Sequence, residues 1–326
     1  MTVELASANV MHRPWGVTDL EPWIENRDVA GPIGEIWFER PGIPSAQPTL
    51  LLKLLFTSQP LSVQVHPGDA YAPSKGMANG KTEAWYVLGA APGAAVAVGL
   101  GRQLTAQQLR CAVEDGSIAE LASWRGVSAG DSVLVPAGTI HAIGAGLVIA
   151  EIQQSSDTTY RLFDYGRQRD LHIDDGIAVA EAGPAGVLPP PIRFTDERTI
   201  LTSCPYFVFE RIELIADTAW RLDAERETWI LAIAGQANVG PINLNLGEAI
   251  FAQSDCLEIQ AGKHGCVALV AYASAGPLPH LLQRSPRPEP QDRWGPEPID
   301  NEPRERSAMP GSTNHTSVDL QKGVWP

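Results

Sequence analysis

Short runs of β-forming residues, separated by glycine and proline, fill residues 34–165 and constrain the fold more than any other feature of the chain. Seven runs fit this description: Glu35–Phe38, Thr49–Phe56, Leu61–His66, Glu83–Leu88, Ala94–Leu100, Asp131–Val135 and Leu147–Gln153. Runs this short at this spacing predict a mainly β sandwich or barrel. Two segments that begin at Thr105 and Ser117 have helical periodicity, with Thr105 as a cap. We therefore expect a small helical insertion at about residues 102–125.

The second half of the chain repeats the first in shorter form. Two segments recur: Thr82–Val87 as Arg226–Leu231, and Gly130–Pro136 as Gly247–Gln253. The repeat predicts two domains, residues 1–183 and 194–276, joined by a Pro- and Gly-rich linker at 184–193. Ten of the 27 prolines lie beyond Gly276, so residues 277–326 are expected to form an extended or disordered tail.

Composition excludes several function classes. The net charge of −14 argues against nonspecific binding to nucleic acid or anionic membranes, since both need a basic surface. No apolar stretch approaches the roughly 20 residues that span a bilayer, and the start of the sequence lacks the features of a secretion signal. The four cysteines show no Cys-x-x-Cys spacing, which argues against a zinc ribbon or a redox motif. We expect a cytoplasmic monomer or weak homo-oligomer.

Four polar residues stand in separate apolar segments: Gln64, His66, Glu83 and His141. Gln64 and His66 share one strand face because successive side chains alternate. Two nitrogen and two oxygen donors would leave coordination positions open, as in a catalytic rather than a structural metal site. The alternative is that these are unrelated polar residues on a half-exposed sheet and in a loop. An ionised glutamate among apolar neighbours is costly to bury unless a cation accompanies it, which favours the metal site.

The segment from Gly130 to His141, with Pro136-Ala-Gly138 inside it, resembles the second motif of the cupin superfamily. Within that superfamily the chain resembles type I mannose-6-phosphate isomerases, particularly the shorter bacterial kind. The matching segments span about residues 10 to 275 and are Arg13-Pro-Trp-Gly16, Gly34–Trp37, Gln64-Val-His66-Pro67, Lys81-Thr-Glu83, Pro136–His141 and Glu151 with Ser156, Asp157 and Arg161.

This resemblance implies two tandem cupin (jelly-roll) barrels, the first catalytic and the second degenerate. It implies zinc held by Gln64, His66, Glu83 and His141, although such donors also suit manganese, iron or cobalt. No second-half residue repeats Gln64 or either histidine, so only the first barrel is expected to hold an ion.

The implied reaction interconverts mannose 6-phosphate and fructose 6-phosphate through an enediol. The catalytic residues implied are Arg161, Glu151 and Lys81, with Ser62, Lys81 and Arg161 as contacts for the phosphorylated hexose. Arg161 suits charge stabilisation because it does not lose its proton at neutral pH. Glu151 would serve as the base if burial raises its pKa. A structurally paired Glu151 and an exposed strand-entry Lys81 are the competing interpretations. A sugar-binding or regulatory cupin without catalysis, or an iron cupin oxygenase, are the alternatives for the whole chain.

Overall fold

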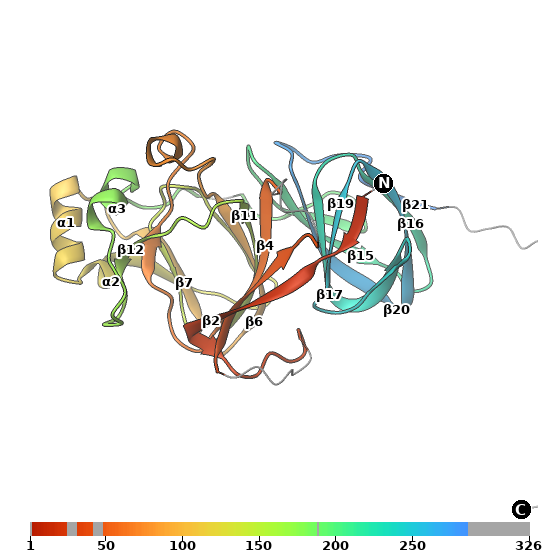
Figure 1. Cartoon of the computed structure of the whole chain (residues 1–326), viewed down its shortest axis with the longest axis horizontal. Coiled ribbons are helices and arrows are strands. Elements are labelled where there is room, and N and C mark those ends of the chain that lie inside the picture. Colours follow the sequence, from red (N-terminus) through yellow and green to blue (C-terminus); the bar gives the residue numbers. More distant parts are fainter. Residues whose placement is uncertain (1, 25–30, 42–47, 188, 286–326) are drawn as a thin grey trace, which may run out of the picture. The chain divides into compact units, whose positions relative to one another are not determined.

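The computed structural model describes residues 2–24, 31–41, 48–187 and 189–285; the predicted tail falls mainly on residues 286–326, outside this set. The described chain is mainly β, as the sequence predicts (Figure 1). It forms three antiparallel sheets, two from the first half and one from the second. Among the described residues, no helix has the length and apolar character that a membrane crossing requires.

The first half contains a six-stranded and a five-stranded sheet. In spatial order the six-stranded sheet consists of β2 (Ser7–Val17), β3 (Ile33–Glu39), β4 (Leu50–Thr57), β11 (Leu147–Gln154), β6 (Glu83–Ala90) and β9 (Ser132–Val135). The five-stranded sheet consists of β12 (Tyr160–Phe163), β5 (Val63–Val65), β10 (His141–Ile143), β7 (Ala95–Leu100) and β8 (Ala122–Gly126). An apolar core that includes Trp85, Ile149, Val96 and Ile143 packs between them. The two sheets therefore face each other, and residues on their inner faces can meet.

Helices cover one end of the first half (Figure 1). They are α1 (Ala106–Glu114), α2 (Ile118–Leu121) and α3 (Ile173–Val179), with a short 3-10 helix η1 (Ala72–Lys75) in the loop after His66. The predicted insertion corresponds to α1 and α2. The Thr105 hydroxyl accepts a hydrogen bond from the Gln108 N–H, and the Gln108 side chain accepts one from the Thr105 N–H, so Thr105 caps α1. Sequence periodicity did not predict α3.

The second half forms the third sheet. Its strands are β13 (Ile192–Arg193), β14 (Arg198–Ser203), β15 (Val208–Leu214), β20 (Asp255–Tyr272), β17 (Thr228–Val239), β19 (Ala249–Gln253) and, from the chain start, β1 (Thr2–Leu5), together with β16 (Ala219–Ala224), β18 (Ile242–Leu244) and β21 (Leu282–Arg284). The order β15-β20-β17-β19 corresponds to β4-β11-β6-β9 in the first half. The internal repeat is therefore visible as a repeated strand order.

The strand pairing aligns the two repeats differently from the sequence, by one residue. Glu83 pairs with Val135 and Gln153, whereas Thr228 pairs with the corresponding positions Ala252 and Tyr272. Thr228, rather than Glu227, thus occupies the place of Glu83. A shift of one residue turns a strand side chain to the other face of its sheet. Glu227 consequently points away from the interior of its own half.

A continuous apolar layer joins the two halves. Leu52, Leu54 and Ile152 of the six-stranded sheet pack in one buried cluster with Trp229 and Phe251 of the second half. The described residues accordingly group into one compact unit.

The structured part of the chain extends beyond Gly276, where the sequence predicted the tail to begin. Strand β21 pairs with β16, and Leu281 and Leu282 are buried. The limits of two separate domains and closure into cupin barrels stay predictions.

Candidate metal centre and adjoining cavity

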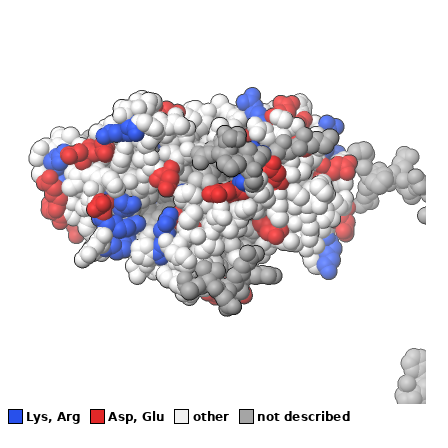
Figure 2. Space-filling view, in the orientation of Figure 1, with Lys and Arg blue, Asp and Glu red and all other residues white. Residues whose placement is uncertain are grey.

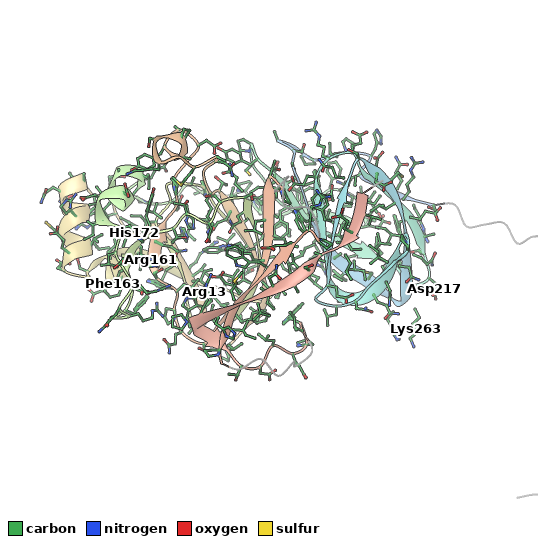
Figure 3. The ribbon with its side chains drawn as sticks, in the orientation of Figure 1. Arg13, Arg161, Phe163, His172, Asp217 and Lys263 are labelled. Carbon is green, nitrogen blue, oxygen red and sulfur yellow. The ribbon has the colours of Figure 1, made fainter. Side chains whose placement is uncertain are left out.

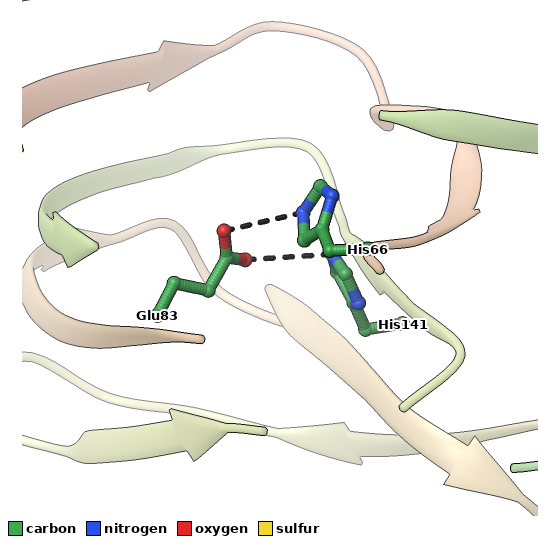
Figure 4. Close-up of side chains that lie close together, drawn as sticks. All are labelled: His66, Glu83 and His141. Atoms are coloured by element: carbon green, nitrogen blue, oxygen red, sulfur yellow. Dashed lines mark ion pairs between the residues drawn. The ribbon is translucent and has the colours of Figure 1, made fainter. Parts of the chain in front are cut away.

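Three of the four predicted ligands meet between the sheets of the first half (Figure 4). Glu83 begins β6, His141 begins β10, and His66 directly follows β5. His66 Nε2 lies 3.2 Å from Glu83 Oε2, and His141 Nε2 lies 3.4 Å from Glu83 Oε1. One ligand atom from each of these residues lies within 4.8 Å of the others, and all three side chains are buried. Strands far apart in sequence therefore place three metal-binding groups at one point.

Both imidazoles turn a lone pair toward that point. The Nδ1 atom of His66 lies 2.9 Å from the Thr158 carbonyl oxygen, and Nδ1 of His141 lies 2.9 Å from that of Thr139. A carbonyl only accepts, so each Nδ1 carries the proton and each Nε2 keeps a lone pair, the form in which imidazole binds a cation. Burial lowers the pKa of His66 to about 3 and also lowers that of His141. The rings are therefore neutral at pH 7, as metal ligands must be.

Gln64 and Ser62 stand beside the cluster. Gln64 Nε2 lies 3.2 Å from His141 Nε2, and the Ser62 hydroxyl donates to Gln64 Oε1 at 3.0 Å. Rotation of the Gln64 amide by 180° would exchange its oxygen and nitrogen and turn the oxygen toward the histidine.

Lys81 is buried inside the cluster rather than exposed. Its Nζ lies 3.2 Å from both Glu83 Oε2 and His66 Nε2. Burial opposes the charge, but Glu83, Glu151 and Glu35 together outweigh burial and raise the pKa of Lys81. Lys81 thus keeps its charge at the centre, and the interpretation of an exposed lysine is wrong.

Glu83 supplies the test of whether a metal fits. Burial opposes its ionisation, but Lys81 and the neighbouring polar groups together outweigh burial and hold the pKa of Glu83 well below its ordinary range. Its Oε2 is fully buried and has no hydrogen-bond partner among the described residues. The charged Nζ of Lys81 lies 3.2 Å away, and the neutral His66 turns its Nε2 lone pair toward the same oxygen, also at 3.2 Å. A buried anionic oxygen between two imidazole lone pairs fits a divalent cation.

A cavity of about 450 Å³ adjoins the centre. That volume lies in the range of small-molecule sites. Arg13 from β2 and Arg161 from β12 approach it from the two sheets (Figure 3), and Figure 2 shows Lys and Arg side chains beside a hollow on this face. Arg13 is held by Glu35 through two hydrogen bonds of 3.1 Å, and Arg169 by Asp164 at 2.7 Å and 2.5 Å.

Arg161 has no ion-pair partner among the described residues. In its side chain, Nη1 donates to the Asp170 carbonyl at 3.2 Å. The backbone N–H of Arg161 donates to His172 Nδ1, also at 3.2 Å. His172 therefore carries its own proton on Nε2 when neutral. Both side chains line the cavity, which gives an anionic ligand an uncompensated guanidinium to bind.

Two residues that line the cavity, Lys53 and Glu151, belong to a row of paired residues across the six-stranded sheet. Trp37, Lys53, Glu151 and Trp85 occupy directly paired positions on β3, β4, β11 and β6. Lys53 Nζ lies 3.7 Å from Glu151 Oε1 and 4.3 Å from the centre of the Trp37 ring, and Trp85 Nε1 donates to Glu151 Oε2 at 3.1 Å. Burial, together with the charge of Glu83, raises the pKa of Glu151 to about 7.

The structure thus brings Ser62, Gln64, His66, Lys81, Glu83 and His141 into one cluster, with Glu151 and Arg161 on the adjoining cavity. Sequence reasoning missed Lys53, Glu35 and His172, which also line the cavity. Lys53 stands in the run Leu50-Leu-Leu-Lys-Leu-Leu55, where a charge in a buried strand was an available signal.

The chain is similar to known proteins in sequence and in fold. No family model matches the chain. Over 198 residues it is 38% identical to a mannose-6-phosphate isomerase of Streptococcus mutans, which covers 58% of this chain and 62% of that protein. Over 139 residues it is 43% identical to one of Bacillus subtilis, with 40% and 44% covered. The matches thus span less than two thirds of these relatives.

The fold comparison covers more of the molecule. The crystal structure of a mannose 6-phosphate isomerase from Bacillus subtilis superposes with a TM-score of 0.74 at 20% identity, over 83% of this chain and 100% of that one. The chain is similar to mannose-6-phosphate isomerases in sequence and in fold. The resemblance drawn from the motifs is therefore confirmed. A phosphomannose isomerase mutant from Salmonella typhimurium gives 0.65 at 15% identity, over 84% and 100%.

Proposed function

We propose that this chain is a metal-dependent aldose–ketose isomerase that interconverts mannose 6-phosphate and fructose 6-phosphate. The observation that supports it best is the meeting of two imidazole lone pairs and the Glu83 carboxylate beside a cavity with an unpaired arginine. The choice of mannose 6-phosphate as the substrate rests on the names of the similar proteins.

His66, His141, Glu83 and Gln64 would hold the ion, for which we propose zinc. The mixed nitrogen and oxygen donor set suits it, as it also suits manganese, iron or cobalt. When bound, such an ion polarises substrate oxygens and stabilises developing negative charge.

Glu151 is the proposed base. It removes the proton from C2 of the open-chain aldose, and the C–H electron pair forms the C1=C2 bond of the enediol while the carbonyl oxygen at C1 gains negative charge. A proton then passes from the oxygen on C2 to the oxygen on C1, and Glu151 returns its proton to C1. A pKa of about 7 suits both directions of transfer near neutral pH.

Charged donors stabilise the anionic groups of the substrate. Lys81, buried and charged beside Glu83, offsets the charge that develops on the oxygen atoms of the enediol. Arg161 binds the phosphate or the enediolate through its planar donors. Ser62, whose hydroxyl donates to Gln64 Oε1, is the further proposed contact for the phosphorylated hexose. Lys81 therefore contributes to the chemistry more than to phosphate binding.

Purified protein mixed with mannose 6-phosphate should produce fructose 6-phosphate, with one metal ion per chain by elemental analysis. His141→Ala should lose metal and turnover together. His264→Ala, at an exposed histidine of the second half, is the matched control and should retain both.

The alternatives predict other outcomes. A fully metal-loaded protein that binds the sugar without turnover would support a regulatory cupin, and substrate-dependent oxygen uptake would support an oxygenase. A His141→Ala variant that keeps stoichiometric metal would exclude the proposed ligand set. Barrel closure, the oligomeric state and a cytoplasmic location stay predictions from the sequence.

A further inference from the structure

Glu227 links the second half of the chain to the first. Its Oε2 accepts hydrogen bonds from the N–H and the hydroxyl of Thr49 at 2.6 and 2.7 Å, and its Oε1 accepts one from the Leu50 N–H at 2.7 Å. The side chain is 6% exposed. Three short donors on a buried carboxylate are charge-assisted hydrogen bonds, which fix geometry more strongly than neutral ones. The register shift of β17 is what directs this carboxylate at the start of β4.

Hydrogen bonds and short stretches of backbone connect Glu227 to the metal centre. The Thr49 carbonyl accepts the Ser155 N–H at 2.8 Å. Ser155 begins the four-residue segment 155–158, whose Ser156 carbonyl accepts Gln153 Nε2 at 2.5 Å. The segment ends at Thr158, whose carbonyl accepts the Nδ1–H of His66 at 2.9 Å. The carbonyl that fixes the His66 tautomer is thus held from the second half of the chain.

We propose that Glu227 is a positioning residue for the metal centre. By holding Thr49, it sets the position of segment 155–158 and thereby keeps Nε2 of His66 directed at Glu83. The second half of the molecule thus contributes to the site without supplying a ligand to it. The inference rests on the proposed function only in requiring that the cluster bind a divalent ion.

Glu227→Gln is the sharpest test because it changes shape least. A glutamine has one acceptor oxygen, so its NH₂ group must face a backbone or hydroxyl donor that the carboxylate now accepts. Direct outer-shell partners of ligating histidines, such as the Thr158 carbonyl here, are typically worth about 10- to 100-fold in metal affinity, and Glu227 acts through that carbonyl. We expect a loss of that size in zinc affinity, measured on the full chain by competition with a chelator. In the metal-free protein, the Nδ1–H NMR signal of His66 should broaden or disappear.

Glu210→Gln is the matched control. Glu210 is a buried carboxylate of the same half, paired with Arg198 at 3.0 Å, and its hydrogen bonds in the described structure stay within that half. This variant should lower the melting temperature at least as much as Glu227→Gln but leave zinc affinity and the His66 signal unchanged. Thr49→Val, which removes one of the three donors, should give a smaller loss of affinity, and Thr49→Ser should retain the wild-type value.

The inference is overturned if Glu227→Gln keeps both wild-type zinc affinity and an unchanged His66 signal. Equal losses of affinity in Glu227→Gln and Glu210→Gln would also overturn it, since they would reduce the effect to general stability. If Glu227→Gln does not fold, unchanged affinity in Thr49→Val decides against the proposal. A wild-type protein that binds zinc without isomerising the sugar would refute the proposed function and leave this test intact.

Discussion

Lys53→Met should shift the pH dependence of turnover to higher pH. The side chain is buried with its Nζ 3.7 Å from Glu151 Oε1, so its charge favours ionisation of that carboxyl. At an effective dielectric constant of about 20, two unit charges at this distance interact by about 4.5 kcal/mol, which sets an upper bound of about 3 pKa units. Carboxyl groups beside one cation typically shift by about 1 to 3 units. Methionine keeps the length of the side chain and removes the charge.

The acidic limb of kcat/KM for mannose 6-phosphate should therefore move up by about 1 to 3 units relative to wild type. Starting from a pKa of about 7, a rise of one unit lowers the ionised fraction of Glu151 at pH 7 about fivefold. Lys75→Met, at an exposed lysine paired with Asp175, is the control and should leave the profile unmoved. A Lys53→Met enzyme with an unshifted acidic limb would refute the role of Glu151 as the base.

The same variant makes a prediction about stability. The folded pKa of Glu151 lies above its ordinary value of 4.5, so its contribution to stability is complete below pH 4.5 and is lost as the pH rises through about 7. Lys53→Met raises the folded pKa further, which extends that loss to higher pH. Urea unfolding of the metal-free protein at pH 6 and pH 9 should show a larger difference in the variant, by about 1.4 kcal/mol per added pKa unit.

Three further predictions test other parts of the molecule. Chelation of the metal should lower the melting temperature, since zinc at a thousandfold excess over its dissociation constant stabilises a protein by about 4 kcal/mol; identical melting with and without zinc would contradict the site. Although burial opposes it, Arg169 and Arg167 hold the pKa of Asp164 below its usual 3.8, so its stabilisation is present above pH 3.8 and lost at lower pH. Asp164→Asn should therefore destabilise the protein at pH 7 more than at pH 2.5 in urea unfolding. Leu52→Ala, in the apolar layer between the halves, should cost about 2 to 5 kcal/mol of unfolding free energy while the folded variant keeps its metal.

The residues of the metal centre could be predicted from sequence because each stands in a local pattern. Strand alternation places Gln64 and His66 on one face, and burial of Glu83 among apolar neighbours requires a compensating charge. These arguments need no knowledge of which strands are neighbours.

The rest of the site depends on strand order and register, which local patterns do not contain. Lys53 and Glu151 are far apart in sequence and become partners only because β4 and β11 pair in one register. Glu227 shows the same limit. The sequence aligns Glu227 with Glu83, but the strand pairing puts Thr228 at that position. Glu227 therefore lies on the opposite face of the sheet.

The apolar layer between the halves bears on how the molecule can be dissected. A protein cut near residue 190 would expose Leu52, Leu54 and Ile152 to water along a whole sheet face. Large exposed apolar surfaces of this kind drive self-association. A shortened form of this chain should therefore retain the second sheet or replace that face with polar side chains, even though the second sheet supplies none of the proposed ligands.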